Sequence, residues 1–239
     1  MTSWACRLVN DPATEQRELP ERSATGNVPH PPSFIRDSDP SPVRARCDDV
    51  RVSTNRKPRR PDVTTVELVG GPEALRHELH RHDERWVDVY RDHRCRIRDA
   101  LAGVDVEVDH IGSTSVPGLA AKPVIDIVVT VDDITAEEDY LGALLAAGYE
   151  LRVREPGHRL VRTPARDVHV HIFERGDPAV DEYLLFRDRL RSDADDRALY
   201  ESTKRALLGR RWDDTNDYAE AKTDVILAIK ARAREARGH

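Results

Sequence analysis

A glycine turn, hydroxyl side chains, a lysine and an aspartate follow one another in a short stretch of the chain. Gly112 is followed by Ser113 and Thr114, and a turn of this kind lets backbone N–H groups and hydroxyls approach an anion. Lys122 follows in the same loop and is a candidate phosphate partner. Asp126 comes next, and a carboxylate at such a place can hold a cation. The combination indicates a site for a nucleoside triphosphate and its metal.

Two histidines further along the chain could join Asp126. Asp126 lies in the run 124–131, whose continuous apolar residues are typical of a central strand, and a carboxylate buried there needs a cation, a metal or backbone donors. His169 and His171 share one face of a strand predicted over 168–173, where both can reach a metal, a phosphate or a proton. We predict that they lie within reach of Asp126 on one sheet face. The alternatives are an aspartate that accepts loop N–H groups and an exposed histidine pair.

Two further basic residues are candidates for contact with an anion. Arg187 lies near the end of a predicted helix, and Lys222 lies beside an aromatic residue in the C-terminal part. Most basic side chains on helices are solvated surface, so the other arginines and lysines there are given no role.

The elements that must position these residues follow from hydrophobic periodicity and turn signals. Thr135 and Glu138 form a plausible capping box for one of the helices. The predicted strands are 63–69, 104–109, 124–131, 149–154, 158–163 and 168–173, and the predicted helices are 73–101, 136–147, 178–191, 194–208 and 216–236. This order predicts an α+β fold in which helices flank a mixed β-sheet and the C-terminal part is helical.

Composition limits the class of protein. The chain has 239 residues, 34% of them charged and 38% hydrophobic, with a formal net charge of −6. This balance argues against broad nucleic-acid binding. No apolar run approaches the ~20 residues of a membrane span, and the N-terminus lacks a signal pattern. The three cysteines, which are widely spaced, indicate neither a disulfide framework nor a zinc site. We expect a cytoplasmic protein without a membrane partner, and the sequence does not identify a protein partner.

Residues 1–61 differ from the rest of the chain. They hold nine of the 15 prolines and have no sustained apolar period. Such a segment cannot bury enough surface to offset the entropy of ordering it. We expect a Pro-rich, disordered tail over 1–61, either a solvated linker or an over-long translated start, and one domain over 62–239.

The motifs around these residues resemble those of the GrpB family, whose members are largely uncharacterised. The resemblance covers roughly 63–235, and its first motif is highly specific. It rests on the run His110–Ile127, on His169-Val170-His171, on Leu185–Arg191, and on the pairs Tyr200 with Lys204 and Tyr218 with Lys222.

The resemblance implies a nucleotidyltransferase-like fold. It implies that Gly112 and Ser113 cradle phosphates and that Asp126 is the first of the carboxylates that hold two Mg²⁺ ions in that superfamily. The second carboxylate position falls on Val128, and the third corresponds to His169 or His171. One aspartate and two histidines suit a single Mn²⁺ or Zn²⁺ better than two Mg²⁺ ions, which prefer oxygen ligands.

Three functions remain open at this point. The first is a metal-dependent enzyme that moves a nucleotidyl or related phosphate group onto a small acceptor. The second is a non-catalytic module that binds a nucleotide or a coenzyme A precursor and acts with a partner, because Val128 replaces a carboxylate. The third and weaker one is a phosphohydrolase built on the histidine pair.

Overall fold

The computed structural model describes residues 59–71, 78–212 and 215–238. Within them, six strands form one mixed sheet in the order β1-β4-β5-β6-β3-β2. The strands are β1 (Glu67–Leu68), β2 (Glu107–Ile111), β3 (Ile125–Val131), β4 (Glu150–Glu155), β5 (His158–Arg162) and β6 (Val168–Glu174). The helices are α2 (Arg85–Ala100), η1 (Ser113–Ser115), α3 (Glu137–Ala146), α4 (Pro178–Ser192), α5 (Ala194–Leu208), α6 (Thr215–Glu220) and α7 (Thr223–Ala236). The predicted α+β class, with helices flanking a mixed sheet, is confirmed.

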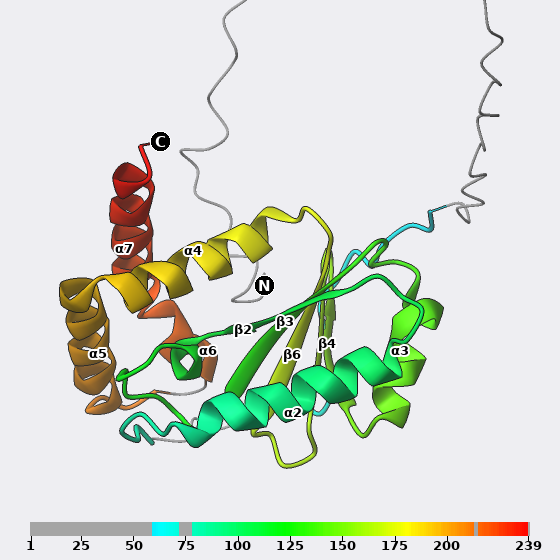
Figure 1. The fold of residues 1–239 in the computed structure, drawn as a ribbon, viewed down its shortest axis with the longest axis horizontal. Coiled ribbons are helices and arrows are strands. Elements are labelled where there is room, and N and C mark those ends of the chain that lie inside the picture. Colours follow the sequence, from blue (N-terminus) through cyan, green and yellow to red (C-terminus); the bar gives the residue numbers. More distant parts are fainter. Residues whose placement is uncertain (1–58, 72–77, 213–214, 239) are drawn as a thin grey trace, which may run out of the picture. The chain divides into compact units, whose positions relative to one another are not determined.

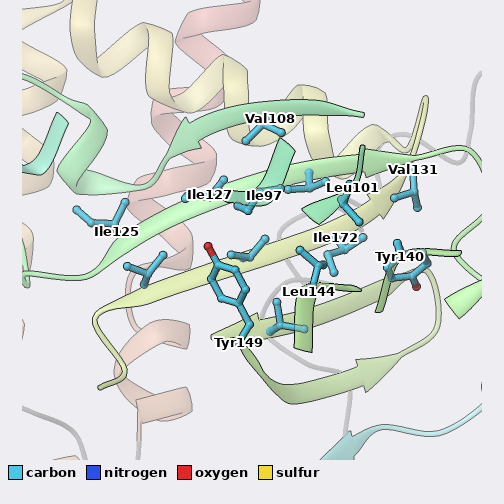
Figure 2. Close-up of a cluster of buried hydrophobic side chains, with 14 of the residues drawn as sticks. Ile97, Leu101, Val108, Ile125, Ile127, Val131, Tyr140, Leu144, Tyr149 and Ile172 are labelled. Carbon is cyan, nitrogen blue, oxygen red and sulfur yellow. The ribbon is translucent and has the colours of Figure 1, made fainter. Parts of the chain in front are cut away.

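The two faces of the sheet carry different side chains, and different helices cover them (Figure 1). On one face, apolar residues of β3 and β6 such as Ile127 and Ile172 pack against α2 and α3 in the main core (Figure 2). Ile97 of α2 and Leu144 of α3 are fully buried there. Burying a side chain of this size contributes about 1.5–3 kcal/mol. The opposite face, which carries Asp126 and the histidines, lies under α4.

The centre of the sheet is a parallel pair, β3 and β6. The other pairs of neighbouring strands are antiparallel. The chain passes from β3 to β6 through α3 and the hairpin of β4 and β5, so the pairing joins segments that are far apart in the sequence. In this register Asp126 is level with His169, and Val128 is level with His171.

The long helix predicted over 73–101 is wrong at its beginning. α2 begins at Arg85, and His80 instead forms a backbone bridge with Ala121, with N–O distances of 2.9 and 3.0 Å. The helical spacing of apolar residues therefore extends to residues that precede the first residue of the helix. Residues 72–77 lie outside the described part of the chain.

Other predicted elements need smaller corrections. The helix predicted over 216–236 is two helices, α6 and α7, separated by a turn at Ala221 and Lys222. The capping box is wrong, because the Thr135 hydroxyl donates to Asp133 at 2.6 Å and α3 has no side-chain cap. β1 is shorter than the predicted strand 63–69. Residues 1–58 of the tail predicted over 1–61 lie outside the described part of the chain.

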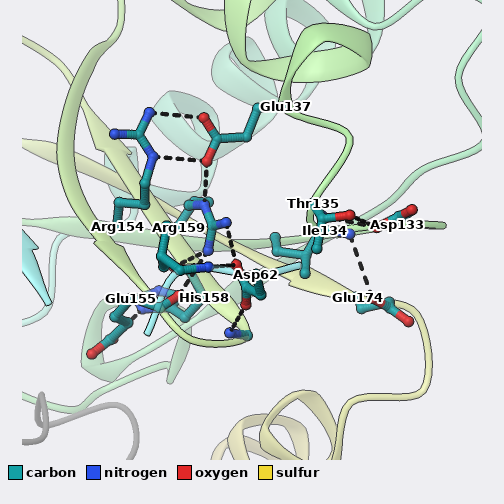
Figure 3. Close-up of polar contacts among 12 residues, drawn as sticks. Asp62, Asp133, Ile134, Thr135, Glu137, Arg154, Glu155, His158, Arg159 and Glu174 are labelled. Atoms are coloured by element: carbon teal, nitrogen blue, oxygen red, sulfur yellow. Dashed lines mark hydrogen bonds and ion pairs between the residues drawn. The ribbon is translucent and has the colours of Figure 1, made fainter. Parts of the chain in front are cut away.

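A buried arginine ties residue 62 to the sheet (Figure 3). Arg159 of β5 is 1% exposed, and its guanidinium donates to Asp62 and to Glu137, both at 2.6 Å. Asp62 also accepts the backbone N–H of Gly157 at 2.6 Å. Burial works against the charge of Asp62, yet these hydrogen bonds lower the pKa of its carboxyl. The network holds the segment before β1 against the β4–β5 turn.

Replacing Arg159 with methionine is expected to destabilise the fold by about 3 kcal/mol, because a buried ion pair loses one partner and the other charges remain. Urea unfolding followed by circular dichroism would measure the change. Arg60→Met is the matched control, because Arg60 pairs with Glu138 on the surface, where such pairs contribute only about 0–1 kcal/mol. Equal effects of the two substitutions would contradict the assigned role of Arg159.

Candidate functional site

Asp126, His169 and His171 meet on the sheet face under α4. Asp126 Oδ1 lies 3.5 Å from His169 Nδ1 and 3.8 Å from His171 Nε2. The parallel pairing of β3 with β6 produces this meeting, since residues at the same height on neighbouring strands direct their side chains to the same face. The predicted convergence of the three residues is therefore observed.

The histidines keep the aspartate ionised. Burial alone would raise the pKa of Asp126, but hydrogen bonding and charge interactions with His169 and His171 hold it well below its usual range. The side chain is 30% exposed, so the carboxylate remains accessible to a bound molecule.

The Gly112 turn closes directly over Asp126. Gly112 has φ = 70°, a conformation that few residues other than glycine adopt. A Cβ at this position would lie 2.4 Å from Asp126 Oδ2, so there is no space for any side chain. The turn and the carboxylate therefore form one unit, in which the glycine permits the close approach.

A chain of buried polar groups lies behind His171. His171 Nδ1 is 3.2 Å from His158 Nε2, and His158 Nδ1 is 2.6 Å from the Glu155 carboxylate. Figure 3 shows the Glu155 and His158 side chains. They are 2% and 4% exposed. Burial lowers the pKa of His158 to about 4. These contacts fix the orientation of the His171 ring, so that its Nε2 faces Asp126.

Ser113, the residue after Gly112, lies at the centre of a second polar group. Lys204 Nζ of α5 is 3.2 Å from Ser113 Oγ and 2.5 Å from the carbonyl oxygen of Ala120, and the Tyr200 side chain also hydrogen-bonds Ser113. Lys204 is 3% exposed. Burial, and then repulsion from Lys222, lowers its pKa to about 7. A buried ammonium beside a serine hydroxyl is an arrangement that can bind an anion.

The two lysines predicted for the site from the sequence share one aromatic ring. Lys222 Nζ lies 4.6 Å and Lys122 Nζ 5.4 Å from the centre of the Tyr218 ring. Burial, and then the charge of Lys122, lowers the pKa of Lys222 to about 8. Two ammonium groups on the same ring give this end of the site a positive potential.

A cavity of about 110 Å³ connects the aspartate with the serine and lysine group. Gly112, Ser113 and Asp126 line it from the sheet side, and Tyr200 and Lys222 line it from the C-terminal helices. One stripe of α4 forms much of the remaining wall: Ala179, Glu182, Tyr183, Phe186, Arg187 and Leu190. These positions recur along α4 at intervals of three and four residues, which places them on one face of the helix.

The predicted site residues differ in their position relative to this cavity. Arg187 lines it and donates to Asp109 at 3.0 Å and to the carbonyl oxygen of His110 at 3.2 Å. The Thr114 hydroxyl donates to the carbonyl oxygen of Val124 at 3.1 Å and lies 3.1 Å from His110 Nε2. Thr114 thus links the turn to the residue before β3, and its contact with an anion remains a prediction. The same holds for Lys122.

A metal site with three protein ligands is not shown. Among the described residues, no group of three or more histidine, cysteine or carboxylate side chains is spaced to hold an ion. Asp126 Oδ1 lies 3.5 Å from His169 Nδ1 and 3.8 Å from His171 Nε2. Both distances are close to the ~3.0–3.4 Å that separates neighbouring ligand atoms on one ion. Asp126 with one histidine therefore fits as part of a metal's ligand set.

The structure describes an α+β protein with a cavity between one end of its mixed sheet and its C-terminal helices. A model of the family described as GrpB protein matches residues 76–232, and the chain belongs to the GrpB family. None of the described helices has the length and apolar character needed to cross a membrane.

Other proteins are similar to this chain in sequence or in fold. UPF0157 protein SCO7215 of Streptomyces coelicolor is 73% identical over 179 residues, covering 75% of this chain and 96% of the relative. The crystal structure of conserved protein GrpB from Enterococcus faecalis is 28% identical with a TM-score of 0.60, covering 68% of this chain and 100% of that one. The Cid1 poly(U) polymerase bound to MgGTP matches at 17% identity and a TM-score of 0.42, over 55% of this chain and 45% of that one.

Proposed function

We propose that the cavity binds a nucleotide or a related phosphorylated small molecule, and that the protein transfers a nucleotidyl or phosphate group from it. The observation that carries the proposal is that Asp126, which is ionised, and Ser113, which is contacted by Lys204, line the same cavity. A polyphosphate bound with one of its phosphates at Ser113 would extend its other phosphates towards the carboxylate. The Gly112 turn sets the spacing between the two groups.

Each group has a defined part in the proposed reaction. Ser113, Lys204 and Lys222 would hold phosphate oxygens and offset their charge. Arg187, kept in place by Asp109, would add positive charge from the α4 side. Asp126 with His169 or His171 would hold a divalent ion such as Mn²⁺, Zn²⁺ or Mg²⁺. When bound, such an ion supplies Lewis-acid stabilisation of the charge that develops on phosphate oxygens.

A thermal-shift panel on the full chain tests binding. The probes are ATP, CTP, GTP, UTP, inorganic tripolyphosphate and coenzyme A precursors, each with and without Mg²⁺, Mn²⁺ and Zn²⁺. A ligand at 100 times its dissociation constant stabilises by about 2.7 kcal/mol. Mass-resolved products with candidate acceptors then test transfer. If no phosphate compound stabilises the protein, the proposal is wrong.

A second function is favoured by one observation. Val128, at the position where the resemblance implies a second carboxylate, is 2% exposed and packs in an apolar cluster with Ile111 and Phe173. A protein without that carboxylate could bind the nucleotide or coenzyme A precursor without reacting. Tight binding with no product, insensitive to added metal, would favour this module, whereas release of free phosphate would indicate a hydrolase.

Phosphate binding is expected to weaken as the pH rises. Lys204, with its pKa at about 7, and Lys222, with its pKa at about 8, lose their charge above these values, and an anion binds the charged forms. The affinity for inorganic tripolyphosphate should fall at least about tenfold between pH 7 and pH 9, with proton uptake on binding. Calorimetry in two buffers of different ionisation enthalpy measures both quantities.

The matched control for this pH dependence is Lys204→Arg, because arginine stays charged over the whole range. Its affinity should decline less steeply with pH than that of the unmodified protein. A pH-independent affinity in the unmodified protein would contradict the placement of the anion at these lysines.

A further inference from the structure

One hydroxyl in the wall of the cavity lacks a hydrogen-bond partner within the described part of the chain. Tyr183 belongs to the stripe of α4 that lines the cavity. Its hydroxyl oxygen is shielded from solvent, and none of the described residues makes a hydrogen bond with it. The ring packs against His171 and Phe173, with centroid distances of 5.8 and 6.1 Å. Ring packing accounts for the aromatic part of the side chain, but it does not account for the oxygen.

Other tyrosines that pack against the sheet do have partners. The Tyr140 hydroxyl donates to the carbonyl oxygen of Ile134 at 2.7 Å, and that of Tyr90 donates to the carbonyl oxygen of Val108 at 3.0 Å. The Tyr149 hydroxyl lies 2.7 Å from His93 Nδ1. A buried hydroxyl normally has such a partner, because leaving it unpaired is unfavourable. At position 183 phenylalanine would pack equally well and avoid that cost.

We propose that the Tyr183 hydroxyl is a ligand-binding group that donates a hydrogen bond to an oxygen of the bound phosphate compound. The inference rests on the proposed function and adds a specificity-determining residue to it. The acceptor is a phosphate oxygen or a sugar oxygen, both of which accept hydrogen bonds in the same way.

The surroundings of Tyr183 favour a donor. Burial, and then the negative charges of Asp126, Glu155 and Asp177, raise the pKa of Tyr183 above its usual range. The hydroxyl therefore keeps its proton at every pH at which the protein would work. The ring packs against His171, whose Nε2 faces Asp126, so the side chain lies beside the end of the cavity where the proposed chemistry takes place.

The test is Tyr183→Phe in the full chain. Removing an unpaired hydroxyl should leave the melting temperature unchanged or raise it by up to about 4 °C. The same change should weaken ligand binding about tenfold, which is 1.4 kcal/mol. The probes are UTP and ATP with Mn²⁺, and inorganic tripolyphosphate with Mn²⁺, measured by calorimetry. Weaker binding of all three probes places the contact on a phosphate, and weaker binding of the nucleotides alone places it on the sugar.

The matched control is Tyr140→Phe, which removes a hydroxyl that has a partner in the main core. It should lower the melting temperature by about 2–4 °C and leave all three affinities unchanged. If the unmodified protein binds the probes and Tyr183→Phe binds them equally well, the inference is wrong and the proposed function stands. If the unmodified protein binds none of them, the proposed function fails and the inference fails with it.

Discussion

Replacing Asp126 with asparagine is expected to reduce group transfer by about 100- to 1,000-fold with little change in the fold. Asparagine has the same shape but no charge, so it cannot attract a divalent ion as strongly. Losses of this size follow the removal of one preorganised electrostatic group from an active site. The measurement is product formation from the nucleotide that the binding panel identifies, at saturating metal.

Asp132→Asn is the matched control for this change. Asp132 follows β3, is 60% exposed and pairs with Arg175 at 3.2 Å. Its replacement should leave transfer unchanged. Full activity in Asp126→Asn would remove the proposed mechanism.

The Asp126→Asn substitution should also change how the stability of the protein depends on acid pH, which can be measured without an activity assay. The pKa of Asp126 is lowered in the folded protein, so the stabilisation from its charge is complete above the unfolded pKa of about 3.9 and is lost as the pH falls below it. Asp126→Asn should therefore lose less stability than the unmodified protein between pH 5 and pH 2. Urea midpoints across that range measure the difference.

Replacing Gly112 with alanine is expected to cause losses of both stability and transfer. The position has φ = 70°, and a Cβ there would lie 2.4 Å from Asp126 Oδ2. Strain in the backbone costs about 1–3 kcal/mol, and the contact with the carboxylate adds to it. Because the turn or the aspartate must move, transfer should fall nearly as far as it does in Asp126→Asn. Chemical unfolding and the same product assay measure the two effects.

Gly118→Ala separates the two causes. Gly118 has φ = 77°, but a Cβ there would meet nothing within 4 Å, so this change carries the backbone strain alone. Gly112→Ala should destabilise by more than Gly118→Ala, and the excess should shrink when Asp126 is also replaced with alanine, because the carboxylate is removed and only the Cβ contact at 3.0 Å remains. Equal effects in both backgrounds would show that the turn and the carboxylate are not coupled.

The strand register needed for the site could be predicted only in part from the sequence. Period-two alternation gave the shared face of His169 and His171, and the apolar run around Asp126 gave a central strand. Whether the two strands are neighbours depends on the path of the whole chain between them. The same limit explains the length predicted for α2, because the bridge of His80 with Ala121 is a tertiary contact that local spacing does not encode.

Several polar groups of the site were not predicted. His158 and Glu155 lie on the predicted hairpin, and only the pairing of β5 with β6 brings His158 to His171. Lys204 was noted in the sequence, but its contact with Ser113 requires α5 to pack against η1. Tyr183 could have been found, since it shares a helical stripe with Arg187 at a spacing of four residues.

The residues of the cavity wall are far apart in the sequence, and this affects when the site can form during synthesis of the protein. The wall begins at Gly112 and ends at Lys230, so it needs residues from the first sheet strands and from the last helix. A growing chain folds from its N-terminus, and the strands could pair before α7 has been made. Until α7 docks, however, the side chains of Ile226 and Lys230 are missing from the wall. The cavity wall is therefore complete only after α7 has been made, and a truncation before α7 removes the part of the wall that Ile226 and Lys230 form.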